Sequence, residues 1–471
     1  MYMGVMFALT TLLVIACIAS IFGGISFSLF SLLSGAALFV LVCLIANYLF
    51  GYMFNVKTQF QSAVISGLIL SFLFTPPSDV KDYIVIAVVS TIAMASKYLL
   101  AWRGRHVFNP AAAGAVIISL TGLGAASWWV ATPALLIPVV LFGTFTLYRT
   151  HRIQMGYLYV LVAIIVSLLV TAMQGSLSDN TIWMVIASYP ILFLAFFMLS
   201  EPLTQAPRNW QRNSIAIGIA IVASSQLFVG NVLLSPELAL IIGNGAAFLF
   251  GQKRAIKLQF IGKKVYSNGQ VAYDFRPHNR LRFTAGQYIE ITLPHGSADM
   301  KGIRRVFSIA SGEHDETLRI ITRHSDPSST FKKQLAALTK NNVVAATGIY
   351  GDFVLPKDKS QKVILLAGGI GITPFLSQLA SDTSGRNITL LYFIRNKNDV
   401  VAPDELAKAA KNGVEVVYVQ DQSIIQAFEQ YIEGGEEAVA YISGSPQFVD
   451  TARAVLKSRT KKTVTDYFTG Y

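Results

Sequence analysis

The chain has 471 residues, of which 53% are hydrophobic and only 14% are charged, and its mean hydropathy is +0.52. That composition excludes a single soluble domain of this length. The net charge of +12 would suit a nucleic-acid partner, but no arginine-rich helix, zinc-binding pattern or aromatic–basic motif accompanies it, so we expect no such partner.

Charged residues concentrate in the second half of the chain. Only nine of the 38 Lys and Arg residues and five of the 26 Asp and Glu residues precede Phe250. A charge-poor segment followed by a charge-rich one predicts a membrane domain joined to a soluble domain. Basic residues beside an anionic leaflet, and others that bind phosphorylated cofactors, explain the positive charge.

The cysteines and the first apolar run set two further limits. Cys17 and Cys43 lie inside apolar runs, where we expect them to be small buried residues. An iron–sulfur cluster needs four ligands, usually thiolates, so the sequence predicts no such cluster and no metal site. The run from Met3 to Ile21 has neither a basic leader nor a clear cleavage site, and we interpret it as a retained first helix.

Apolar runs recur through the first half of the chain. Most are long enough, or nearly so, to cross about 30 Å of hydrocarbon as a helix. The runs near 60–75 and 109–122 are shorter and suit half-helices or broken helices that line a buried site. The runs cover residues 4–22, 27–50, 60–75, 83–100, 109–122, 132–148, 155–173, 182–199, 213–228 and 236–250.

The loops between these runs alternate in charge. By the positive-inside rule the basic loops face the cytoplasm. This predicts about ten helices with both termini on the cytoplasmic side. We expect the membrane to be the cell (plasma) membrane, with its lipid around the helices. The opposite loops have few charges, and the last helix begins there with Ser235-Pro236-Glu237, a typical helix start. The basic loops contain Lys57, Arg103, Arg105, Arg149, Arg152, Arg208, Arg212, Lys253 and Arg254.

Three polar segments interrupt the apolar half. Asn109-Pro110 starts a helix after basic residues, and its small residues 111–114 fit either a helix-packing face or an anion or flavin site at a helix N-terminus. The segment 200–207 is a proline-bounded polar loop, which an ordinary helix terminator would resemble. The segment 128–133 holds paired tryptophans, typical of interfacial anchors.

Two of these segments resemble known membrane proteins. Phe108-Asn-Pro-Ala-Ala and Glu201-Pro-Leu-Thr-Gln-Ala-Pro are similar to motifs of the D subunit of Rnf electron-transport complexes and the B subunit of the sodium-pumping NADH:quinone oxidoreductase, over roughly residues 30–250. The resemblance implies a flavin, FMN or riboflavin, near Asn109, Thr132 and Thr204. In those families a threonine before proline carries FMN as a phosphoester. Here Thr132-Pro133 is kept but follows Trp129-Val130, and Glu201 stands where an aspartate is usual.

The soluble half begins with strand patterns over about 255–356. The segment 285–293 alternates like a barrel strand. In the segment 304–311, Arg305 is placed to fork onto a pyrophosphate, Phe307 to stack on a flavin ring and Ser308 to bond it, although a strand with a surface arginine would look similar. Further on, Thr322 ends a strand and 328–330 caps an apolar-periodic helix.

An α/β pattern follows. The run 363–367 reads as a buried parallel strand and leads into a glycine-rich turn, Gly368 to Gly371, and then a helical pattern after Thr373-Pro374. Such a turn lets a pyrophosphate approach the backbone at a helix N-terminus, although alone it is often an ordinary tight turn. Further strands are expected at 388–394, 414–419 and 438–446.

Five motifs occur in order: Arg-x-aromatic-Ser, Gly-x-x-Gly-x-Phe, Ala-Gly-Gly-Ile-Gly-Ile-Thr-Pro, Ser-Gly-x-Pro and an aromatic C-terminus. Residues 255–471 therefore resemble the ferredoxin–NADP⁺ reductase superfamily. This implies an FAD-binding β-barrel at 253–358 and an NAD(P)-binding α/β domain at 359–471, after a polytopic α-helical membrane domain at 1–252. The implied FAD contacts are Arg305, Val306, Phe307, Ser308, Thr322, Ser329 and Thr330. The implied nicotinamide-nucleotide contacts are Gly368, Gly369, Gly371, Thr373, Gly444, Pro446 and Phe468.

Catalytic roles follow from the same resemblance. Ser308, Thr373 and Ser443 are expected at the hydride-transfer site. Two departures matter: Phe307 replaces the usual tyrosine, and Ser443 stands where many members have cysteine. Arg395 and Lys397 beyond the 388–394 strand fit either a 2′-phosphate contact or surface charge, so the choice between NADH and NADPH stays open.

The two halves together predict an NAD(P)H-oxidising FAD enzyme. Haem needs helix-borne axial histidines, whereas His106 and His151, the only histidines of the first half, lie in loops. Cytoplasmic FAD alone does not bridge about 30 Å of hydrocarbon, so we expect a further flavin in the membrane half and an extracytoplasmic flavoprotein or redox partner as acceptor. The alternatives are an NAD(P)H:quinone reductase and a ferredoxin or flavodoxin reductase on a non-conducting anchor.

Overall fold

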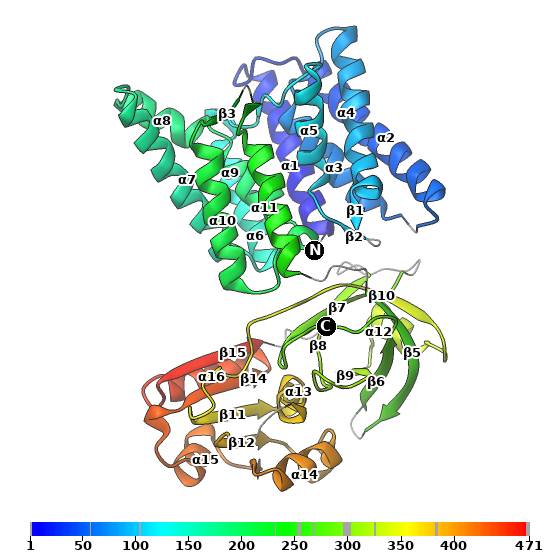
Figure 1. Ribbon diagram of the computed structural model, residues 1–471, viewed down its shortest axis with the longest axis vertical. Helices are drawn as coiled ribbons and strands as arrows, with labels where there is room; N and C mark the ends of the chain where they lie inside the picture. The colour runs from blue at the N-terminus through cyan, green and yellow to red at the C-terminus, as the bar shows by residue number, and fades with distance from the viewer. Residues whose placement is uncertain are drawn as a thin grey trace. The chain divides into compact units, whose positions relative to one another are not determined.

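The computed structural model describes residues 2–56, 58–102, 105–230, 232–251, 256–266, 269–294, 303–324, 326–381 and 385–467. The chain forms two compact units, Met1–Arg254 and Ala255–Tyr471 (Figure 1). Lys57, Arg103, Lys253, Arg254 and the predicted nucleotide contact Phe468 lie outside the described residues.

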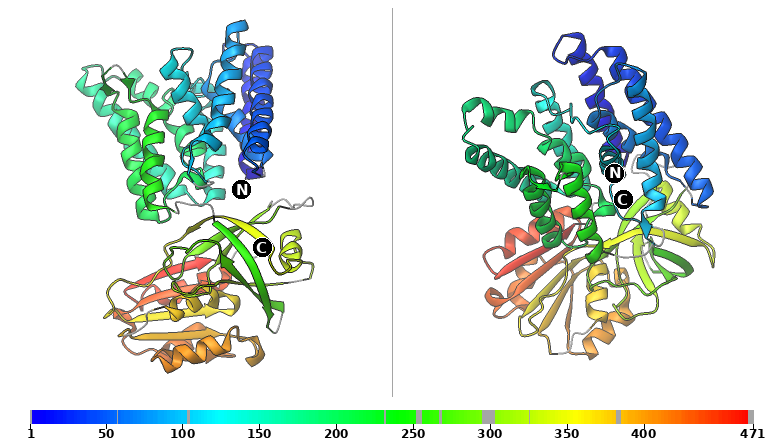
Figure 2. Two further views of the ribbon diagram at one scale, coloured as in Figure 1. Left: turned by 45° about the vertical axis from the view of Figure 1, so that its right-hand side comes forward. Right: turned by 45° about the horizontal axis from the view of Figure 1, so that its top comes forward.

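The N-terminal unit is a bundle of helices, seen from two further sides in Figure 2. Its helices lie on the apolar runs of the sequence, and the run near 182–199 is divided into three pieces that end in a π-helical turn. The helices are α1 (Tyr2–Ile21), α2 (Leu29–Met53), α3 (Phe60–Leu73), α4 (Val80–Leu99), α5 (Pro110–Thr121), α6 (Leu136–Thr150), α7 (Ile153–Met173), α8 (Asp179–Ala187), α9 (Ile191–Phe193), η2 (Leu194–Met198), α10 (Asn209–Ser224) and α11 (Pro236–Phe250).

Length and composition make part of this bundle suitable for a bilayer. Six helical segments in the described part of the chain are long and apolar enough to cross a membrane, and α3, α5 and α11 are shorter apolar helices. The number of crossings expected from the sequence, about ten, and the cytoplasmic placement of both termini stay predictions. The six segments are Tyr2–Ile21, Leu29–Met53, Val80–Leu99, Pro133–Thr150, Ile153–Met173 and Asp179–Met198.

Helices α5 and α11 begin with the same local design at opposite ends of the bundle. Asn109 accepts a hydrogen bond from the amide of Ala112, Ser235 accepts one from Leu238, and a proline follows each cap. Helix α5 follows the hairpin of β1 (Ala101–Trp102) and β2 (Arg105–His106), and α11 follows that of β3 (Phe228–Val229) and β4 (Val232–Leu233), at the other end (Figure 1).

The contacts between helices repeat in the same way. Helix α2 packs on α4 and α4 on α5, while α7 packs on α10 and α10 on α11, and α5 lies against α11. The two halves of the unit therefore repeat one helix order in opposite directions. In membrane transporters this arrangement places binding sites at the interface between the repeats.

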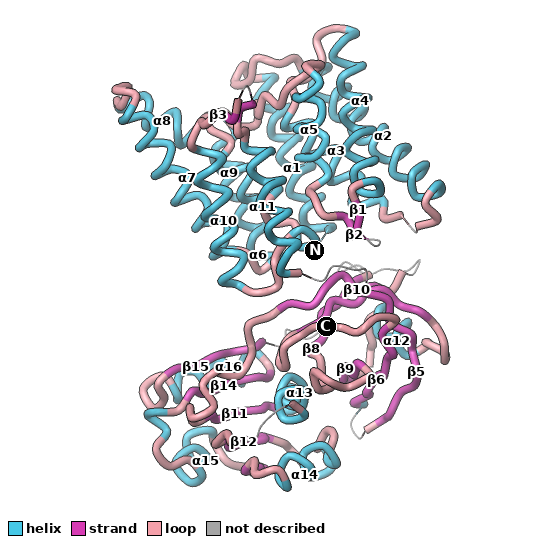
Figure 3. The backbone as a smooth tube through the Cα atoms, in the orientation of Figure 1, coloured by secondary structure: helices cyan, strands magenta, loops and turns pink. Residues whose placement is uncertain are grey.

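The C-terminal unit begins with a six-stranded antiparallel sheet of order β8-β7-β10-β5-β6-β9 (Figure 3). The expected closed barrel is wrong. Twist brings the two edge strands near each other, but among the described residues they pair at one bridge, Ile309 with Ile320, so the sheet stays open. Its elements are β5 (Ile256–Val265), β6 (Gln270–Pro277), β7 (Tyr288–Thr292), β8 (Arg304–Ser308), β9 (Leu318–Arg323), α12 (Thr330–Ala336) and β10 (Val343–Tyr350).

A five-stranded parallel sheet follows, of order β13-β12-β11-β14-β15. Apolar side chains of α13 and α14 cover one face of it, and those of α15 and α16 cover the other. The strand order reverses between β11 and β14, and nucleotides bind beyond the carboxyl ends of the strands at such a point. The elements are β11 (Val363–Gly368), η5 (Gly369–Ile372), α13 (Thr373–Ala380), β12 (Ile388–Phe393), α14 (Pro403–Lys411), β13 (Glu415–Val419), α15 (Ile424–Tyr431), β14 (Val439–Gly444), α16 (Pro446–Leu456) and β15 (Lys462–Tyr467).

One buried and two partly exposed polar contacts join the two sheets into one unit. The hydroxyl of Ser377 on α13 donates to the carbonyl of Ser311 at 2.7 Å. Arg319 on β9 pairs with Asp274 on β6 at 2.7 Å and with Glu405 on α14 at 2.6 Å. The guanidinium of Arg319 thus binds a carboxylate of the antiparallel sheet and one of helix α14, which covers the parallel sheet. These contacts fix the mutual orientation of the two sheets.

The tight crossing of α2 and α3 gives a stability prediction. A Cβ atom on Gly67 would lie 2.8 Å from the Cα atom of Val40 and 3.0 Å from the carbonyl oxygen of Phe39. Gly67→Ala should therefore force the helices apart and destabilise the fold by about 1–3 kcal/mol, the usual range for overpacking. The thermal unfolding midpoint in detergent measures the effect.

The matched control is Gly218→Ala in α10. A Cβ atom there meets nothing within 4 Å, and alanine favours a helix over glycine by about 1 kcal/mol. The Gly218→Ala protein should unfold at the same temperature or higher. An unchanged midpoint for Gly67→Ala would contradict the close packing of α2 on α3.

Candidate functional site

A cavity of about 740 Å³ lies between the two sheets of the C-terminal unit. Pockets for cofactors and other small molecules typically measure about 300–1,000 Å³. Strands β8 and β9 and helix α12 line one side of the cavity, and the carboxyl ends of β11, β12 and β13 with the start of α16 line the other. Six predicted contacts are part of this lining: Val306, Phe307, Ser308, Thr322, Gly368 and Gly369.

The predicted FAD motif on β8 is divided between the cavity and the sheet core. The guanidinium of Arg305 lies 5.2 Å from the centre of the Phe331 ring, and the Phe307 ring lies 5.9 Å from the same ring. Successive residues of a strand point to opposite faces, so Arg305 and Phe307 share one face and Ser308 takes the other. The pyrophosphate contact of Arg305 and the ring stacking of Phe307 stay predictions.

The glycine-rich turn after β11 has a steric reason for its composition. A Cβ atom on Gly371 would collide with the carbonyl oxygen of Ser443 and lie 2.7 Å from the Cα atom of Gly444. Gly369 has a φ of +54°, which glycine adopts without strain. The turn therefore lies directly against the end of β14, and Gly368, Gly369 and Ser445, the residue after β14, line the same cavity.

In this structure Thr373 and the predicted helix cap Ser329 form hydrogen bonds with backbone groups. The hydroxyl of Thr373 donates to the carbonyl of Ile370 at 3.1 Å, and only 1% of the residue is exposed. Ser329 caps α12 by accepting from the Lys332 amide, and Thr330 is the first residue of that helix. Pro446 opens α16 in the same manner after its cap Ser445, which lines the cavity. Ligand contacts of Thr373, Ser329, Thr330 and Pro446 stay predictions.

An acidic residue that the sequence reasoning did not assign lies beside the predicted catalytic serines. Asp466 on β15 accepts a hydrogen bond from the hydroxyl of Ser308, and its register partner on β14 is Ser443. The hydroxyl of Ser443 is fully buried and has no hydrogen-bond partner in the described part of the chain. Burial raises the pKa of Asp466 to about 6. In the sequence, the signal for Asp466 is an acidic residue in the C-terminal segment after the last strand pattern.

The cavity lining is rich in cations. Its basic residues are Arg323, Lys332 and Arg395, and its acidic residues are Asp399 and Asp421. The ammonium of Lys332 donates to the carbonyl of Arg323 at 2.6 Å, which holds both residues at the rim of the cavity. A positive surplus in a cleft attracts anionic ligands such as dinucleotides. Because Arg395 and Asp399 carry opposite charges in this lining, the choice between NADH and NADPH stays open.

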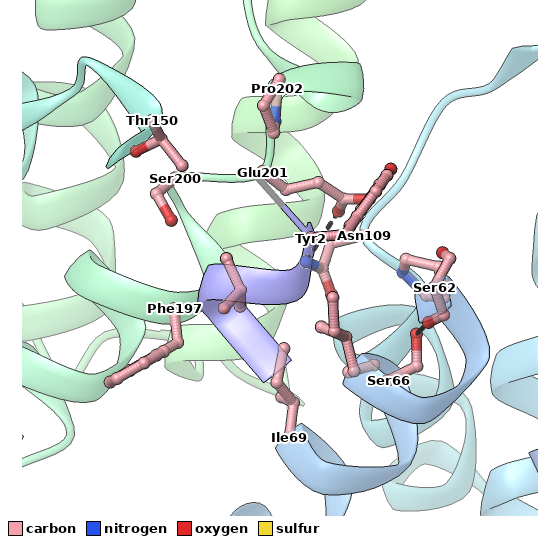
Figure 4. A pocket seen from close by; sticks show the side chains of 14 residues that line it. Tyr2, Ser62, Ser66, Ile69, Asn109, Thr150, Phe197, Ser200, Glu201 and Pro202 are labelled. Atoms are coloured by element: carbon pink, nitrogen blue, oxygen red, sulfur yellow. Dashed lines mark hydrogen bonds between the residues drawn. The ribbon is translucent and has the colours of Figure 1, made fainter. Parts of the chain in front are cut away.

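A second candidate site lies in the N-terminal unit, where α5 begins (Figure 4). The side-chain amide of Asn109 donates to Glu201 at 2.9 Å, and the ring of His106 lies 3.3 Å from the other Glu201 oxygen. Thr204 bonds the backbone carbonyl of Glu201 at 3.2 Å. The pocket beside them measures about 40 Å³, far below the about 300 Å³ at which ligand pockets begin.

The third polar segment lies at the other end of the bundle. Thr132 precedes the short helix η1 (Pro133–Leu135) and α6, while Thr150 at the end of α6 lines the small pocket with Asn109 and Glu201. These 18 residues of helix separate the two ends by about 25 Å. Asn109 and Thr204 therefore lie at one end of the bundle and Thr132 at the other, because the helix length keeps Thr132 away from the other two. The expected flavin contacts of the three residues stay predictions.

Thr132 nevertheless has an unusual environment. Its hydroxyl oxygen is buried and has no hydrogen-bond partner in the described residues, although buried polar atoms are normally paired. Trp128 and Trp129, expected as exposed interfacial anchors, are only 7% and 6% exposed. Their indole groups donate to Glu237 at 3.2 Å and to the Ser71 carbonyl at 2.7 Å. The tryptophans thus fix the turn that carries Thr132.

Comparison with known proteins relates the chain to flavin-dependent reductases. No known protein-family profile matches it. It is 25% identical over 234 residues to NADH-cytochrome b5 reductase 1 of Ajellomyces capsulatus, which covers 44% of this chain and 75% of that protein. It is also 25% identical over 214 residues to the terephthalate 1,2-dioxygenase reductase component 1 of Comamonas sp., which covers 40% and 62%.

Solved structures show a similar partial match. A ferredoxin–NADP⁺ reductase from Neisseria gonorrhoeae with bound FAD and NADP is 17% identical, with a TM-score of 0.40, and covers 45% of this chain and 97% of that one. The C-terminal half resembles NAD(P)H-dependent FAD oxidoreductases, which confirms the expected enzyme class. The resemblance of the N-terminal half to Rnf and sodium-pumping oxidoreductase subunits stays a prediction.

The raised pKa of Asp466 predicts a pH dependence of stability. An aspartate in an unfolded chain titrates near about 3.9, whereas in the folded unit its pKa is about 6. The folded state therefore binds this proton more tightly, and the resulting stabilisation is present below pH about 4 and lost as the pH rises through about 6. Asp466→Asn removes that loss, so urea unfolding from pH about 5 to about 7 should show a shallower decline than the wild type.

The control for this measurement is Asp358→Asn. Hydrogen bonds from Ser360 lower the pKa of the exposed Asp358 carboxylate, so the group stays ionised over the same pH range. Asp358→Asn should follow the wild-type slope. Parallel slopes for Asp466→Asn and the wild type would show that Asp466 titrates normally.

Proposed function

We propose that the chain is a membrane flavoprotein that oxidises NADH or NADPH at an FAD held by the C-terminal unit and passes the electrons through the N-terminal unit to an acceptor on the opposite side. The observation that carries the proposal is the shared cavity, which brings Ser308 and the glycine-rich turn to one space on a chain with six helices of membrane length. The cavity fits the predicted cofactors in volume and charge.

Residues around the cavity have distinct tasks in this proposal. Arg323, Lys332 and Arg395 attract the nucleotide phosphates, and the turn after β11 gives them access to backbone amides. Ser308 lines the cavity in which the flavin and nicotinamide rings would meet, and its hydroxyl donates a hydrogen bond to Asp466, which orients it. The hydroxyl of Ser443, the register partner of Asp466, is buried. FAD, when bound, would accept the hydride with its two electrons and pass these electrons on one at a time.

The outer surface of the N-terminal unit supports its place in a membrane. Large apolar side chains on several helices are exposed, among them Phe7 at 60%, Phe30 at 75% and Leu161 at 58%. Such residues on a soluble protein would form large apolar patches, whereas in a bilayer they contact lipid. In this proposal the NAD(P)H-oxidising unit of the same chain supplies the electrons that this unit carries.

Thr132 is the proposed attachment point of a second flavin. Its buried hydroxyl has no hydrogen-bond partner in the described residues, which supports attachment of an FMN phosphate at this oxygen. Bound there, FMN would supply a one-electron carrier at the outer end of the bundle. An extracytoplasmic flavoprotein or other redox partner would take electrons from it.

The first test uses proteoliposomes with ferricyanide sealed inside and NADH or NADPH added outside. Only molecules with an exterior C-terminal unit meet the nucleotide, so reduction of the enclosed ferricyanide reports transfer across the bilayer. We expect reduction without added quinone. Gly371→Ala should abolish it, because a methyl group at Gly371 displaces the turn from β14.

The alternatives give different results in the same vesicles. Reduction that requires added quinone would identify a quinone reductase, and nucleotide oxidation that never reduces the enclosed ferricyanide would identify a reductase on a non-conducting anchor. Either result contradicts the proposal.

The second test is the intact mass of the purified protein. The wild type should exceed the polypeptide mass by one FMN phosphoester, and Thr132→Val should lose this addition together with transfer to enclosed ferricyanide. Bleaching of FAD by NADH should persist, because Thr132 belongs to the other unit. Thr121→Val is the control, since the Thr121 hydroxyl already donates to the Ile118 carbonyl. A wild-type mass equal to that of the polypeptide alone would contradict covalent attachment.

A further inference from the structure

Four buried aromatic rings form a continuous column through the N-terminal unit. The ring centres of Trp129 and Phe72 are 5.4 Å apart, those of Phe72 and Phe193 are 5.5 Å apart, and those of Phe193 and Phe197 are 4.9 Å apart. These distances are typical of aromatic rings in direct contact. The four residues, which we call the aromatic column, belong to the α5–α6 loop, α3, α9 and η2.

The column joins the two polar ends of the unit. At one end Trp129 shares a tight turn with Thr132, whose amide donates to the Val130 carbonyl at 3.0 Å. At the other end Phe197 lines the small pocket with Asn109 and Glu201 (Figure 4). The ring centres of the column therefore cover at most about 16 Å of the interval of about 25 Å that α6 spans between Thr132 and the pocket.

The rings are held in fixed positions. Phe72 and Phe193 are 0% and 1% exposed, and Phe197 is 3% exposed. The indole of Trp129 is fixed by its hydrogen bond to the carbonyl of Ser71, the residue before Phe72. Phe197 lies in η2, a π-helical turn, and such turns occur frequently at functional sites.

We propose that the aromatic column is the path along which electrons cross the apolar middle of the N-terminal unit, from the pocket beside Glu201 to the turn of Thr132. The inference rests on the proposed function, because it requires electron transfer across this unit. Tunnelling falls exponentially with the gap to be crossed, and conjugated rings in contact lower the barrier relative to saturated side chains. The rings mediate the transfer without being oxidised, so no bond in the column forms or breaks.

The electron balance is simple. One NADH becomes NAD⁺ and releases a proton and two electrons at the C-terminal unit. Two one-electron acceptors at the far side, two ferricyanide ions in the vesicle assay, become two ferrocyanide ions. The column adds and removes no electrons in this sum.

Phe193 is the residue to change, because it contacts rings on both sides. Phe193→Leu keeps an apolar side chain and removes the ring, whereas Phe193→Tyr keeps a ring. Phe39→Leu is the matched control, since Phe39 is 0% exposed in the same unit and its ring pairs with Phe74, outside the column. Each full-length protein is measured in the ferricyanide vesicles, with FAD bleaching by NADH and the thermal unfolding midpoint recorded alongside.

We expect Phe193→Leu to slow reduction of enclosed ferricyanide severalfold, with unchanged FAD bleaching, and Phe193→Tyr to restore the rate. Phe39→Leu should lower the unfolding midpoint about as much as Phe193→Leu but leave the rate unchanged. Equal rates for Phe193→Leu and Phe39→Leu would overturn the column while leaving transmembrane transfer established. No reduction of enclosed ferricyanide by the wild type would overturn the proposed function, and the column with it.

A spectroscopic measurement tests the outer end independently of turnover. Indole rings quench an excited flavin by donating an electron, so Trp129→Phe should lengthen the fluorescence lifetime of a flavin attached at Thr132. Trp183→Phe is the control, because Trp183 is 53% exposed on α8, away from the column. A lifetime that Trp129→Phe leaves unchanged would show that Trp129 and the flavin are not in electronic contact and would overturn this end of the column.

Discussion

The C-terminal unit depends on one contact that only a residue without a side chain permits. Gly371 lies against the backbone of Ser443 and Gly444, so the turn after β11 and the end of β14 close together at the point where the strand order reverses. The cavity opens beyond this point. Helix α13 starts at the same turn and carries Ser377, whose hydroxyl binds the antiparallel sheet through the Ser311 carbonyl. One backbone approach thus positions the parallel sheet, the cavity and the neighbouring sheet together.

The N-terminal unit is organised by the opposite requirement. Polar groups within a bilayer would have no water to bind, and several side-chain contacts pair such groups at the ends of this bundle. Asn109, His106 and Glu201 satisfy one another at one end, and Trp128 with Glu237 does so at the other. Between the ends lie mostly apolar and aromatic side chains, together with buried hydroxyl groups such as those of Ser90 and Ser167.

Local sequence patterns predicted the elements well where a single periodicity dominates. The strand expected at 363–367 is β11, Val363–Gly368, and the helix starts at Asn109-Pro110 and Ser235-Pro236 are confirmed with their caps. The closed barrel was wrong, because closure depends on pairing between strands that are distant in sequence, and only Ile309 and Ile320 pair across the gap. No local pattern encodes that pairing.

The sequence by itself determined the division into an apolar and a charged half, the order of helices and strands, the glycine-rich turn and the enzyme class of the C-terminal half. Only the tertiary structure decided that Asp466 bonds Ser308 beside Ser443, and that Thr132 lies at the other end of the bundle from Asn109. The reason is physical. A periodicity reports which face of one element is buried, whereas neighbours across a sheet or a bundle follow from strand order and helix length, which are properties of the whole fold.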